Sequence, residues 1–485
     1  MTQDDGSCEN PDMASQRIFK ILSATAGDGT SARLGQLALP GRKVVETPNF
    51  TSVASRGAVP HLTPDNVTRH TDLSSTYMAL EDCRSLPTLE SGLPLTTDVV
   101  IEKPNAAIYE FEGEGEGSRP LHAFSAFPQE IPTILAARRC PAVTAPSGNT
   151  SKLLAIFTST GFRNISIAEY AEAVRKLKPD VVVGPADLLH SSQAPAAKKQ
   201  LRMTERTEDW LDQFLGLLNA DTRANSNVPE SLIFAPLIPV EWKIQWTYLR
   251  HLAEDVLDGI SGLAVYDVNL MPELTAFKFG NLPKLSLDTP QNPQDILRQI
   301  SLGIDICLVP FVNNVSDAGV ALTFSFPAPK TTTGIQPLGT NMWSSEHKTS
   351  LAPLVESCTC YACQKHHSAF VNHLLNAKEM LGWTLLQIHN HHVLTQFFKG
   401  VREALAQGLE EFEALVQEFA TVYDSEIPAG TGERPRARGY HFKSEQNQEK
   451  YNPRTWKDLN NNSNFGTEGT EKPHEVAMTD GQPPA

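Results

Sequence analysis

Three of the chain's seven cysteines, Cys358, Cys360 and Cys363, fall within one short stretch. Thiolates this close in sequence can face a single metal ion, and three sulfurs with one imidazole nitrogen make a closed tetrahedral set for Zn²⁺. Cysteine also packs as a small hydrophobic residue, but such dense clustering favours a metal. A closed ligand set leaves no position for water or substrate, so the cluster predicts one structural zinc ion rather than a catalytic one.

The fourth ligand must come from a group of histidines that follows the cysteines. The candidates are His366, His367, His373, His389, His391 and His392. A ligand at His366 would close only a small local ring, whereas one at His389 would tie a distant element to the cysteine loop. We therefore predict a Cys358, Cys360, Cys363 and His389 site, and take the other histidines as rivals.

Two helices are expected to position these ligands. Apolar spacing predicts a first helix from His366 to about Leu381, ended by Gly382. Residues 384–388 would then return the chain to the loop. His389 would begin a second helix that runs to about Phe419 and is apolar on more than one face, as expected for a helix buried on several sides.

The region before the cysteines alternates between strand-like and helix-like runs. Ser166 and Glu169 form a capping box at the start of one helix, and further helical patterns cover 206–219, 244–256 and 293–302. Repeated units of this length indicate a parallel sheet with helical crossovers. Their number suits an α/β fold of the (β/α)8 TIM type, although periodicity alone fits an open doubly wound sheet nearly as well. Candidate strands are Leu153–Thr158, Asp180–Val183, Ser231–Leu237, Gly262–Val268, Lys284–Leu287 and Asp305–Pro310.

Composition sets limits on partners and location. The chain has 485 residues, 40% of them hydrophobic, and a net charge of −15, which argues against a general nucleic-acid coat without excluding a local basic patch. The acidic start of the sequence is unlike a secretory signal, and no apolar stretch reaches the length of a membrane span. An odd cysteine count with a thiolate cluster suits a reducing compartment, so we expect a cytoplasmic protein, with peripheral association to an organelle surface left open.

The spacing of the four ligands resembles the zinc signature of the tRNA-guanine transglycosylases. The resemblance recurs in chain order along most of the sequence. It implies the closed (β/α)8 barrel, with a zinc-binding subdomain near the C-terminal end. The matching segments are Ala32–Gly35, Val45–Pro48, Gly57–Pro64, Gly303–Asp305, Gly319–Phe326 and Phe370–Gly382.

The same resemblance shows which catalytic groups are missing. Catalytic members of the family place a nucleophilic aspartate three residues after the aspartate that Asp305 matches, and Leu308 stands there. Ala186 stands where a base-recognising aspartate is expected, with Asp187 one position away. The proton-handling Thr-Asp-Ser-Gly-Gly run has no clear counterpart. A nucleophile and a proton-transfer group are both required for base exchange, so no catalytic residue is predicted.

Loss of the carboxylates with retention of the zinc signature is typical of the non-catalytic branch of this family. The resemblance implies an accessory subunit that pairs with a catalytic subunit as a heterodimer and supports exchange of guanine for queuine at the wobble position of tRNA. Two rival functions stay open. One is an active transglycosylase that uses Asp187 and Asp305, and the other is a zinc-stapled RNA-binding scaffold.

The expected organisation follows from these assignments. We expect a disordered N-terminus at 1–17, the barrel with loop insertions at 18–326, a linker insertion at 327–350, a zinc-binding subdomain with a dimerisation helix at 351–426, and a disordered polar tail at 427–485. The stretches 112–117 and 188–205 are expected to be surface loops. The short basic run in the tail, 434–438, is taken as solvated.

Overall fold

The computed structural model describes residues 18–22, 31–82, 107–111, 119–144, 148–158, 161–190, 194–222, 231–330 and 334–430. The segments expected to be disordered, 1–17 and nearly all of the tail, lie outside the described residues, as does the loop expected at 112–117.

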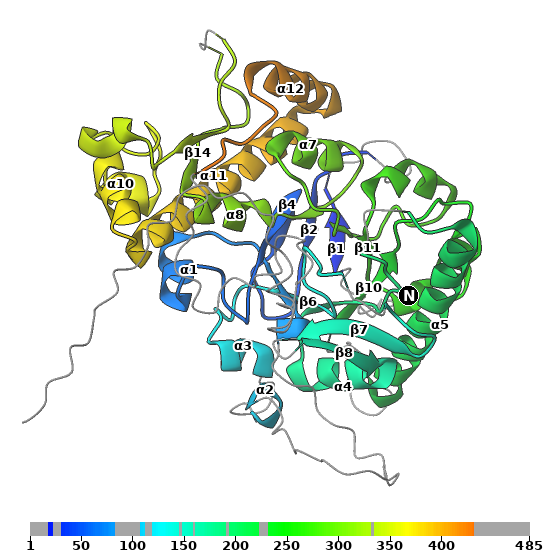
Figure 1. Cartoon of the computed structure of the whole chain (residues 1–485). Coiled ribbons are helices and arrows are strands. Elements are labelled where there is room, and N and C mark those ends of the chain that lie inside the picture. The colour runs from blue at the N-terminus through cyan, green and yellow to red at the C-terminus, as the bar shows by residue number, and fades with distance from the viewer. Residues whose placement is uncertain are drawn as a thin grey trace, which may run out of the picture.

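A closed barrel of parallel strands forms the centre of the molecule (Figure 1). The barrel closes where the last strand pairs with the first, so that Leu308 lies opposite Thr51. The (β/α)8 expectation is therefore confirmed over the open-sheet alternative. In order around the barrel the strands are β4 (Asn49–Val53), β5 (Thr76–Ala79), β6 (Thr133–Ala136), β9 (Val181–Val183), β10 (Leu232–Leu237), β11 (Gly262–Val265), β12 (Lys284–Ser286) and β13 (Ile306–Leu308).

Helices surround the barrel because each crossover must return the chain to the start of the next parallel strand. The capping box at Ser166 and Glu169 is present, and the helices expected near 244–256 and 293–302 are confirmed. The elements of this layer are α1 (Pro64–His70), η1 (Leu80–Asp82), α2 (Ala107–Glu110), α3 (Pro120–Ser125), α4 (Ile167–Leu177), α5 (Ala197–Thr222), α6 (Trp246–Glu254), η2 (Leu257–Gly259), η3 (Val268–Ala276), α7 (Pro293–Ser301) and α8 (Phe311–Asp317).

Alternation along the strands separates two apolar cores. Inward side chains such as Phe234, Leu285 and Leu308 pack inside the barrel, whereas their neighbours along the strands pack outward against the helices. The barrel interior is thus a filled core rather than a channel. Leu308 is fully buried within it.

Two of the sequence-based assignments are corrected here. Leu153–Thr158 is a strand, β7, but it pairs antiparallel with β8 (Gly161–Ser166) in a hairpin outside the barrel. The stretch expected as a loop at 188–205 contains the first turns of α5, which begins at Ala197. Its first turns are rich in Lys and Arg, so the basic composition concealed a good helix-forming sequence.

A small antiparallel sheet precedes the barrel, formed by β1 (Phe19–Ile21), β2 (Gly35–Leu37) and β3 (Val45–Thr47). Arg33 joins this sheet to the amino-terminal end of the barrel. Its guanidinium donates to both carboxylate oxygens of Asp305 at 2.8 and 2.6 Å, and to the carbonyl of Leu282. Because Asp305 directly precedes β13, its carboxylate lies at the amino-terminal end of the barrel. We call the opposite end, where the carboxyl ends of the strands meet, the mouth.

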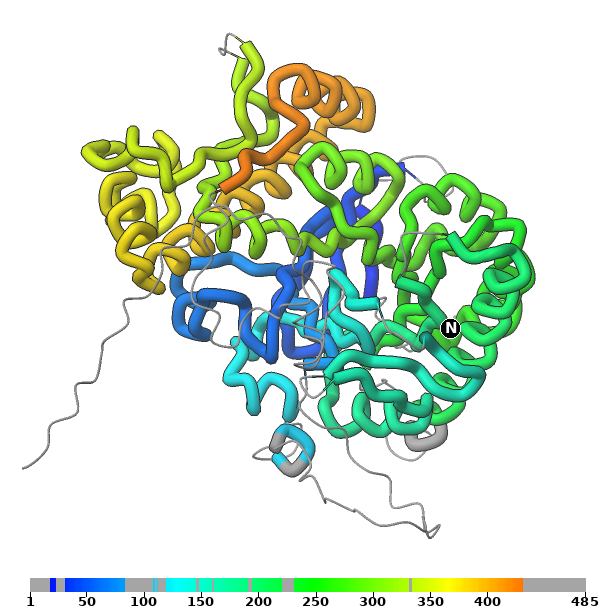
Figure 2. Tube along the Cα trace, in the orientation of Figure 1, coloured from blue at the N-terminus to red at the C-terminus, as the bar shows by residue number. Residues whose placement is uncertain are grey.

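The C-terminal part projects from one flank of the barrel (Figures 1 and 2). The segment expected as a linker at 327–350 contains β15, which pairs with β14 on the barrel side. The elements are β14 (Val320–Leu322), β15 (Gly339–Asn341), η4 (Ser345–Thr349), α9 (Tyr361–Lys365), α10 (Ser368–Asn376), α11 (Met380–Gln407) and α12 (Leu409–Val422).

The expected helix boundaries in this part are wrong in two places. Gly382 does not end a helix but lies in the first turn of α11, where α10 approaches so closely that a Cβ would meet Leu374 at 3.2 Å. The break falls earlier, at Lys378, which has a left-handed backbone with φ of 58°. The long helix also stops at Gly408, whose φ of 133° is one that L side chains rarely adopt, and α12 follows as a separate helix.

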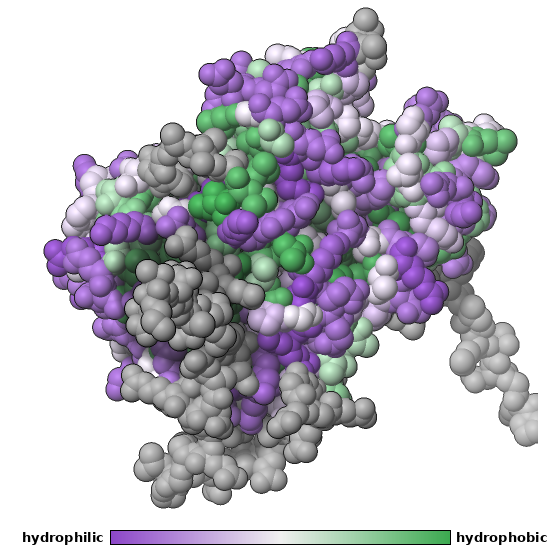
Figure 3. All heavy atoms as spheres, turned by 180° about the vertical axis from the view of Figure 1, so that it is seen from behind, coloured by the Kyte–Doolittle hydropathy of each residue, from purple (hydrophilic) through white to green (hydrophobic). Residues whose placement is uncertain are grey.

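The surface carries mixed side chains. Figure 3 shows hydrophilic side chains over much of the far face, with a hydrophobic area near its middle. Among the helices of the described residues, none combines the length and the apolar character needed to cross a bilayer.

Candidate metal centre

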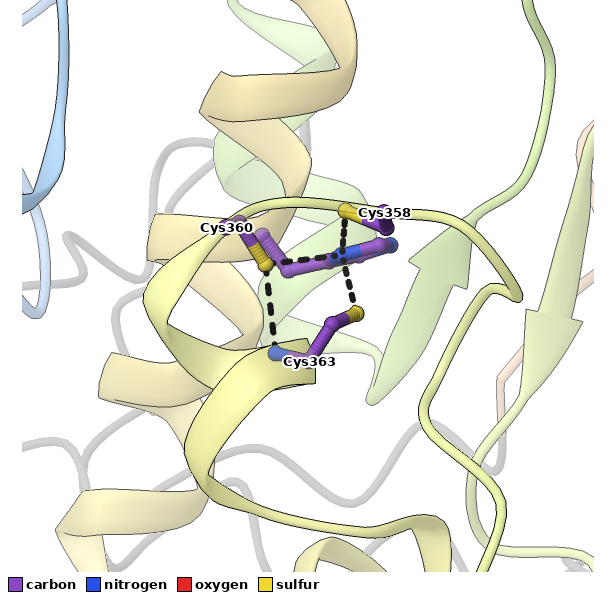
Figure 4. A group of neighbouring side chains, drawn as sticks. Cys358, Cys360 and Cys363 are labelled. Carbon is purple, nitrogen blue, oxygen red and sulfur yellow. Dashed lines mark hydrogen bonds between the residues drawn. The ribbon is translucent and has the colours of Figure 1, made fainter.

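The four predicted ligands meet at one point beside the barrel. Cys358 and Cys360 lie in the loop before α9, Cys363 lies in its first turn, and His389 comes from α11. Their ligand atoms all lie within 4.8 Å of one another, and three of the four residues are buried. Figure 4 shows the three sulfurs around the imidazole ring that enters from the long helix.

The spacing of these atoms fits a tetrahedral metal site. The Nδ1 atom of His389 lies 3.7, 3.5 and 3.4 Å from the sulfurs of Cys358, Cys360 and Cys363. Metal–sulfur and metal–nitrogen bonds of about 2.3 and 2.0–2.1 Å at tetrahedral angles give sulfur–nitrogen separations of about 3.6 Å. The donor set can therefore hold one metal ion, and all four donors are used in doing so.

The titration of the three thiols and the imidazole is coupled. Hydrogen bonds with Cys360 and Cys363 lower the pKa of the Cys358 thiol. Hydrogen bonds with Cys358 and Cys363 raise the pKa of the Cys360 thiol. Burial lowers the pKa of His389, but the thiolates of Cys358 and Cys363 outweigh it and raise that pKa to about 9. A proton on the imidazole and a metal ion at Nδ1 compete for the same place, because metal ligands bind deprotonated.

A second layer of hydrogen bonds orients the ligands. The Nε2 atom of His389 lies 2.9 Å from the carbonyl oxygen of Leu322, so Nε2 donates and Nδ1 is left for the metal. The sulfur of Cys360 accepts from the backbone N–H of Cys363 at the start of α9, a bond that favours its thiolate form. Negative charge at a helix N-terminus is favourable, and so the loop is arranged for a thiolate.

Asn390 fixes the position of α11 against the barrel side. Its amide oxygen accepts from the backbone N–H of Leu322 at 2.8 Å, and its nitrogen donates to the carbonyl of Val320 and the hydroxyl of Ser316. The residue is fully buried. The sequence gives only its place beside His389 in the motif, and the role as a three-way link to β14 and α8 emerges from the structure.

The other candidate histidines have different surroundings. His391 is buried, donates from Nδ1 to the Gln387 carbonyl, and has a pKa lowered by burial to about 4. His367 accepts from Phe370 N–H at the start of α10, and His392 lies 3.2 Å from the Thr359 hydroxyl. Only His389 joins the three thiols among the described residues. It does so from within α11, not from the start of a helix as expected, because α11 already begins at Met380.

Catalytic carboxylates are expected at the barrel mouth, where active sites of (β/α)8 barrels lie. Leu308 ends β13 inside the apolar core, and Ala186 is buried in a small apolar cluster just beyond β9. Asp187 follows it but pairs with Arg206 at 2.9 Å and accepts from Asn149. Burial is the largest influence on Asp187 and raises its pKa, although Asn149 and Arg206 act to lower that pKa.

A buried ionic cluster occupies another part of the mouth. Glu81 is fully buried and pairs with Arg138 and with Arg139, and its oxygens also accept from the backbone N–H groups of Arg139 and Phe157. Asp82 pairs with Arg139 at 3.2 Å. These carboxylates hold the β7–β8 hairpin against the barrel, so their lone pairs are engaged by the protein itself.

Comparison with known proteins supports the resemblance found in the sequence. A family model described as queuine tRNA-ribosyltransferase matches residues 28–425. A Schizosaccharomyces pombe protein named queuine tRNA-ribosyltransferase accessory subunit 2 is 35% identical, covering 82% of this chain and 83% of its own length. Proteins of the same name from Xenopus tropicalis and Drosophila persimilis are each 26% identical, over 80% and 82% of this chain and 96% and 92% of theirs.

Proposed function

The chain belongs to the queuine tRNA-ribosyltransferase family, and from this premise we propose that it is the non-catalytic subunit of a heterodimer. In the proposed complex the catalytic partner exchanges guanine for queuine at the anticodon wobble position of tRNA. This chain supports the reaction without carrying out a chemical step. Its relatives are named as accessory subunits, which is the role proposed here.

One observation carries the proposal: Leu308 stands at the strand end where the family's nucleophile is expected, and it is fully buried. An alkyl side chain cannot form a covalent intermediate with a ribose carbon, which requires an activated nucleophile. Leu308 contributes instead to the apolar filling of the barrel. Ala186 likewise offers no group for reading a base or moving a proton.

The geometry disfavours relocated carboxylates. Asp305 is held by Arg33 at the amino-terminal end of the barrel, a full strand length from the mouth. Asp187 lies near the mouth but is paired with Arg206. Neither is placed to meet a ribose and a base together, which is the arrangement that an active transglycosylase would need.

The Cys₃His cluster is proposed to hold one structural Zn²⁺. Cys358, Cys360, Cys363 and His389 would bind it, and zinc fits because three thiolates and one imidazole form a favoured tetrahedral set. The ion would fix the cysteine loop to α11, and through Asn390 to the barrel. We propose that this keeps a partner-binding surface in shape.

An aromatic surface beside the metal centre is the proposed contact with the catalytic subunit. Tyr361 is 36% exposed and stacks on His70 of α1, with ring centroids 4.1 Å apart. His366 and Phe370 form a second stacked pair at 5.2 Å. Such rigid, partly exposed aromatic groups are typical of the centres of protein interfaces. We name these four residues the aromatic patch.

The experiment that tests the function is release of guanine from queuine-accepting tRNA. The purified chain is assayed alone, then mixed with a catalytic transglycosylase subunit that is itself assayed alone. Exchange that depends on the mixture supports the proposal. Exchange by the chain alone would mean that it is catalytic, and failure to associate with the catalytic subunit would favour the zinc-stapled scaffold.

A further inference from the structure

Three basic side chains line the exposed side of the first two turns of α5. Lys198, Lys199 and Arg202 are all exposed. Residues four apart lie one above the other on a helix, so Lys198 and Arg202 form a row, with Lys199 beside it. We call these three residues the basic stripe.

The basic stripe lies at the rim of the barrel mouth. The chain leaves the carboxyl end of β9 at Val183 and reaches the start of α5 at Ala197. One turn beyond the stripe, Arg206 pairs with Asp187 at 2.9 Å and donates to the Thr150 carbonyl, which fixes this end of α5 above the mouth. In Figures 1 and 2, α5 lies on the flank of the barrel remote from α10 and the metal centre.

The fold gives no electrostatic reason for the stripe. Within the described part of the chain, none of the three cations forms a salt bridge. Lys199 interacts electrostatically with the Asp187 carboxylate, but that carboxylate is already paired with Arg206. Cations in the first turn of a helix oppose its dipole, and neighbouring like charges repel. The whole chain nevertheless carries a net charge of −15. A bound anion would offset this repulsion and favour the start of α5.

We propose that the basic stripe binds the phosphate backbone of an RNA. The inference rests on the proposed function, in which the substrate of the complex is a tRNA. Contacts from Lys and Arg to phosphates position an RNA without reading its sequence. A protein partner docked on the aromatic patch would leave this flank free, so both contacts can be made at once.

An anionic membrane fits the stripe less well than RNA. A helix that binds in a membrane surface needs a free apolar face beside its basic one. The apolar face of α5 is occupied by the protein, since Met203, Trp210 and Phe214 are buried against the barrel. Leu201 is exposed beside the stripe, at 47%, which is a small apolar area by comparison.

The test is a double charge reversal, Lys198→Glu with Arg202→Glu, in the full-length chain. Affinity for a tRNA transcript is measured by fluorescence anisotropy across a salt series, for the chain alone and for its complex with the catalytic subunit. Two lost phosphate contacts should lower the slope of log K against log salt by about 1.4–1.8, and weaken binding about tenfold or more at 0.1 M salt. Lys20→Glu with Lys278→Glu changes the net charge equally at exposed sites away from the mouth and should have little effect.

The outcomes separate this inference from the proposed function. Unchanged affinity and salt slope in the Lys198→Glu, Arg202→Glu variant would overturn the RNA site, while base exchange by the mixture would still support the accessory role. Equal loss in the Lys20→Glu, Lys278→Glu control would also overturn it, since the effect would then be one of net charge. Loss of binding to phosphatidylserine vesicles, with RNA binding intact, would assign the stripe to a membrane. Circular dichroism and zinc content verify that both variants are folded.

Discussion

His389 and Leu322 are joined by a hydrogen bond of 2.9 Å from the imidazole Nε2 to the carbonyl oxygen. The bond links the metal centre to β14, and thus the cysteine loop to the barrel. It also fixes which ring nitrogen faces the sulfurs, because Nε2 is used as a donor. The metal centre is therefore part of the packing between the C-terminal helices and the barrel. Its disruption should destabilise both the helices and their contact with the barrel.

Removal of a thiolate should release the metal and destabilise the C-terminal part. For Cys360→Ala we expect zinc content to fall from one ion per chain to near zero, with a cost on the order of 5 kcal/mol, because metal binding at such sites is folding free energy. Zinc is measured by mass spectrometry and stability by urea unfolding. Cys140→Ser, at a half-buried cysteine outside the cluster, is the control and should keep its zinc. A zinc-free Cys360→Ala protein of unchanged stability and partner affinity would contradict the proposed role.

Replacing the buried leucine at the strand end should not create an enzyme. Leu308→Asp places a carboxylate in an apolar core, where we expect a cost of about 3–5 kcal/mol. The chain alone should still give no guanine release, since Ala186 supplies no second carboxylate. Leu308→Asn has nearly the same shape without the charge and serves as the matched variant in unfolding and exchange assays. Measurable exchange by Leu308→Asp alone would show that the remaining machinery is present after all.

Truncation within the aromatic patch should weaken association with the catalytic subunit. For Phe370→Ala we expect at least a tenfold loss of affinity, as buried aromatic anchors at interface centres cost about 2 kcal/mol or more when removed. Zinc content should not change. Phe124→Ala removes an equally large aromatic side chain that is 46% exposed on α3, and should associate normally in the same calorimetric titration. Similar losses for both variants would argue against a specific contact at the patch.

Two hydrogen bonds from His251 to carboxylates should make the stability of the protein depend on pH. His251 of α6 lies 2.9 Å from Asp212 of α5 and 2.9 Å from Asp255. Burial lowers its pKa, but hydrogen bonds to the two carboxylates outweigh burial and raise it. Because the folded pKa is above the unfolded value of about 6.5, the contribution is fully present below that pH and is lost as pH rises through the folded pKa.

The effect should be small because the partners are largely exposed. The free energy of unfolding, measured with urea, should fall between pH 5.5 and pH 9 more for the wild type than for His251→Gln. The difference between the two falls should be under about 1 kcal/mol. Nuclear magnetic resonance titration of the His251 ring gives the folded pKa directly. A ring that titrates below the unfolded value would mean that the two carboxylates do not hold it in solution.

The sequence by itself predicted the cluster of three cysteines and a histidine that could hold a metal ion, and it predicted the class of fold. Ligand identity depends on residue types at short spacing, so Cys358, Cys360 and Cys363 could be recognised directly, and alternation of strand and helix patterns indicated the barrel. The prediction that Leu308 stands in place of a nucleophile also came from the sequence, because it needs only a count from Asp305. Local capping at Ser166 and Glu169 was also predictable, since both partners lie within one helical turn.

Tertiary structure decided what depended on contacts between distant segments. Gly382 looks like a helix terminator, but the close approach of α10 makes it a packing position inside α11. His389 therefore lies in the middle of that helix. The β7 strand has ordinary strand composition, and only its pairing with β8 places it outside the barrel. The roles of Asn390 and of the carboxylates paired at the mouth could not be read from spacing, because their hydrogen-bond and salt-bridge partners lie far away in the chain and are brought near only by folding.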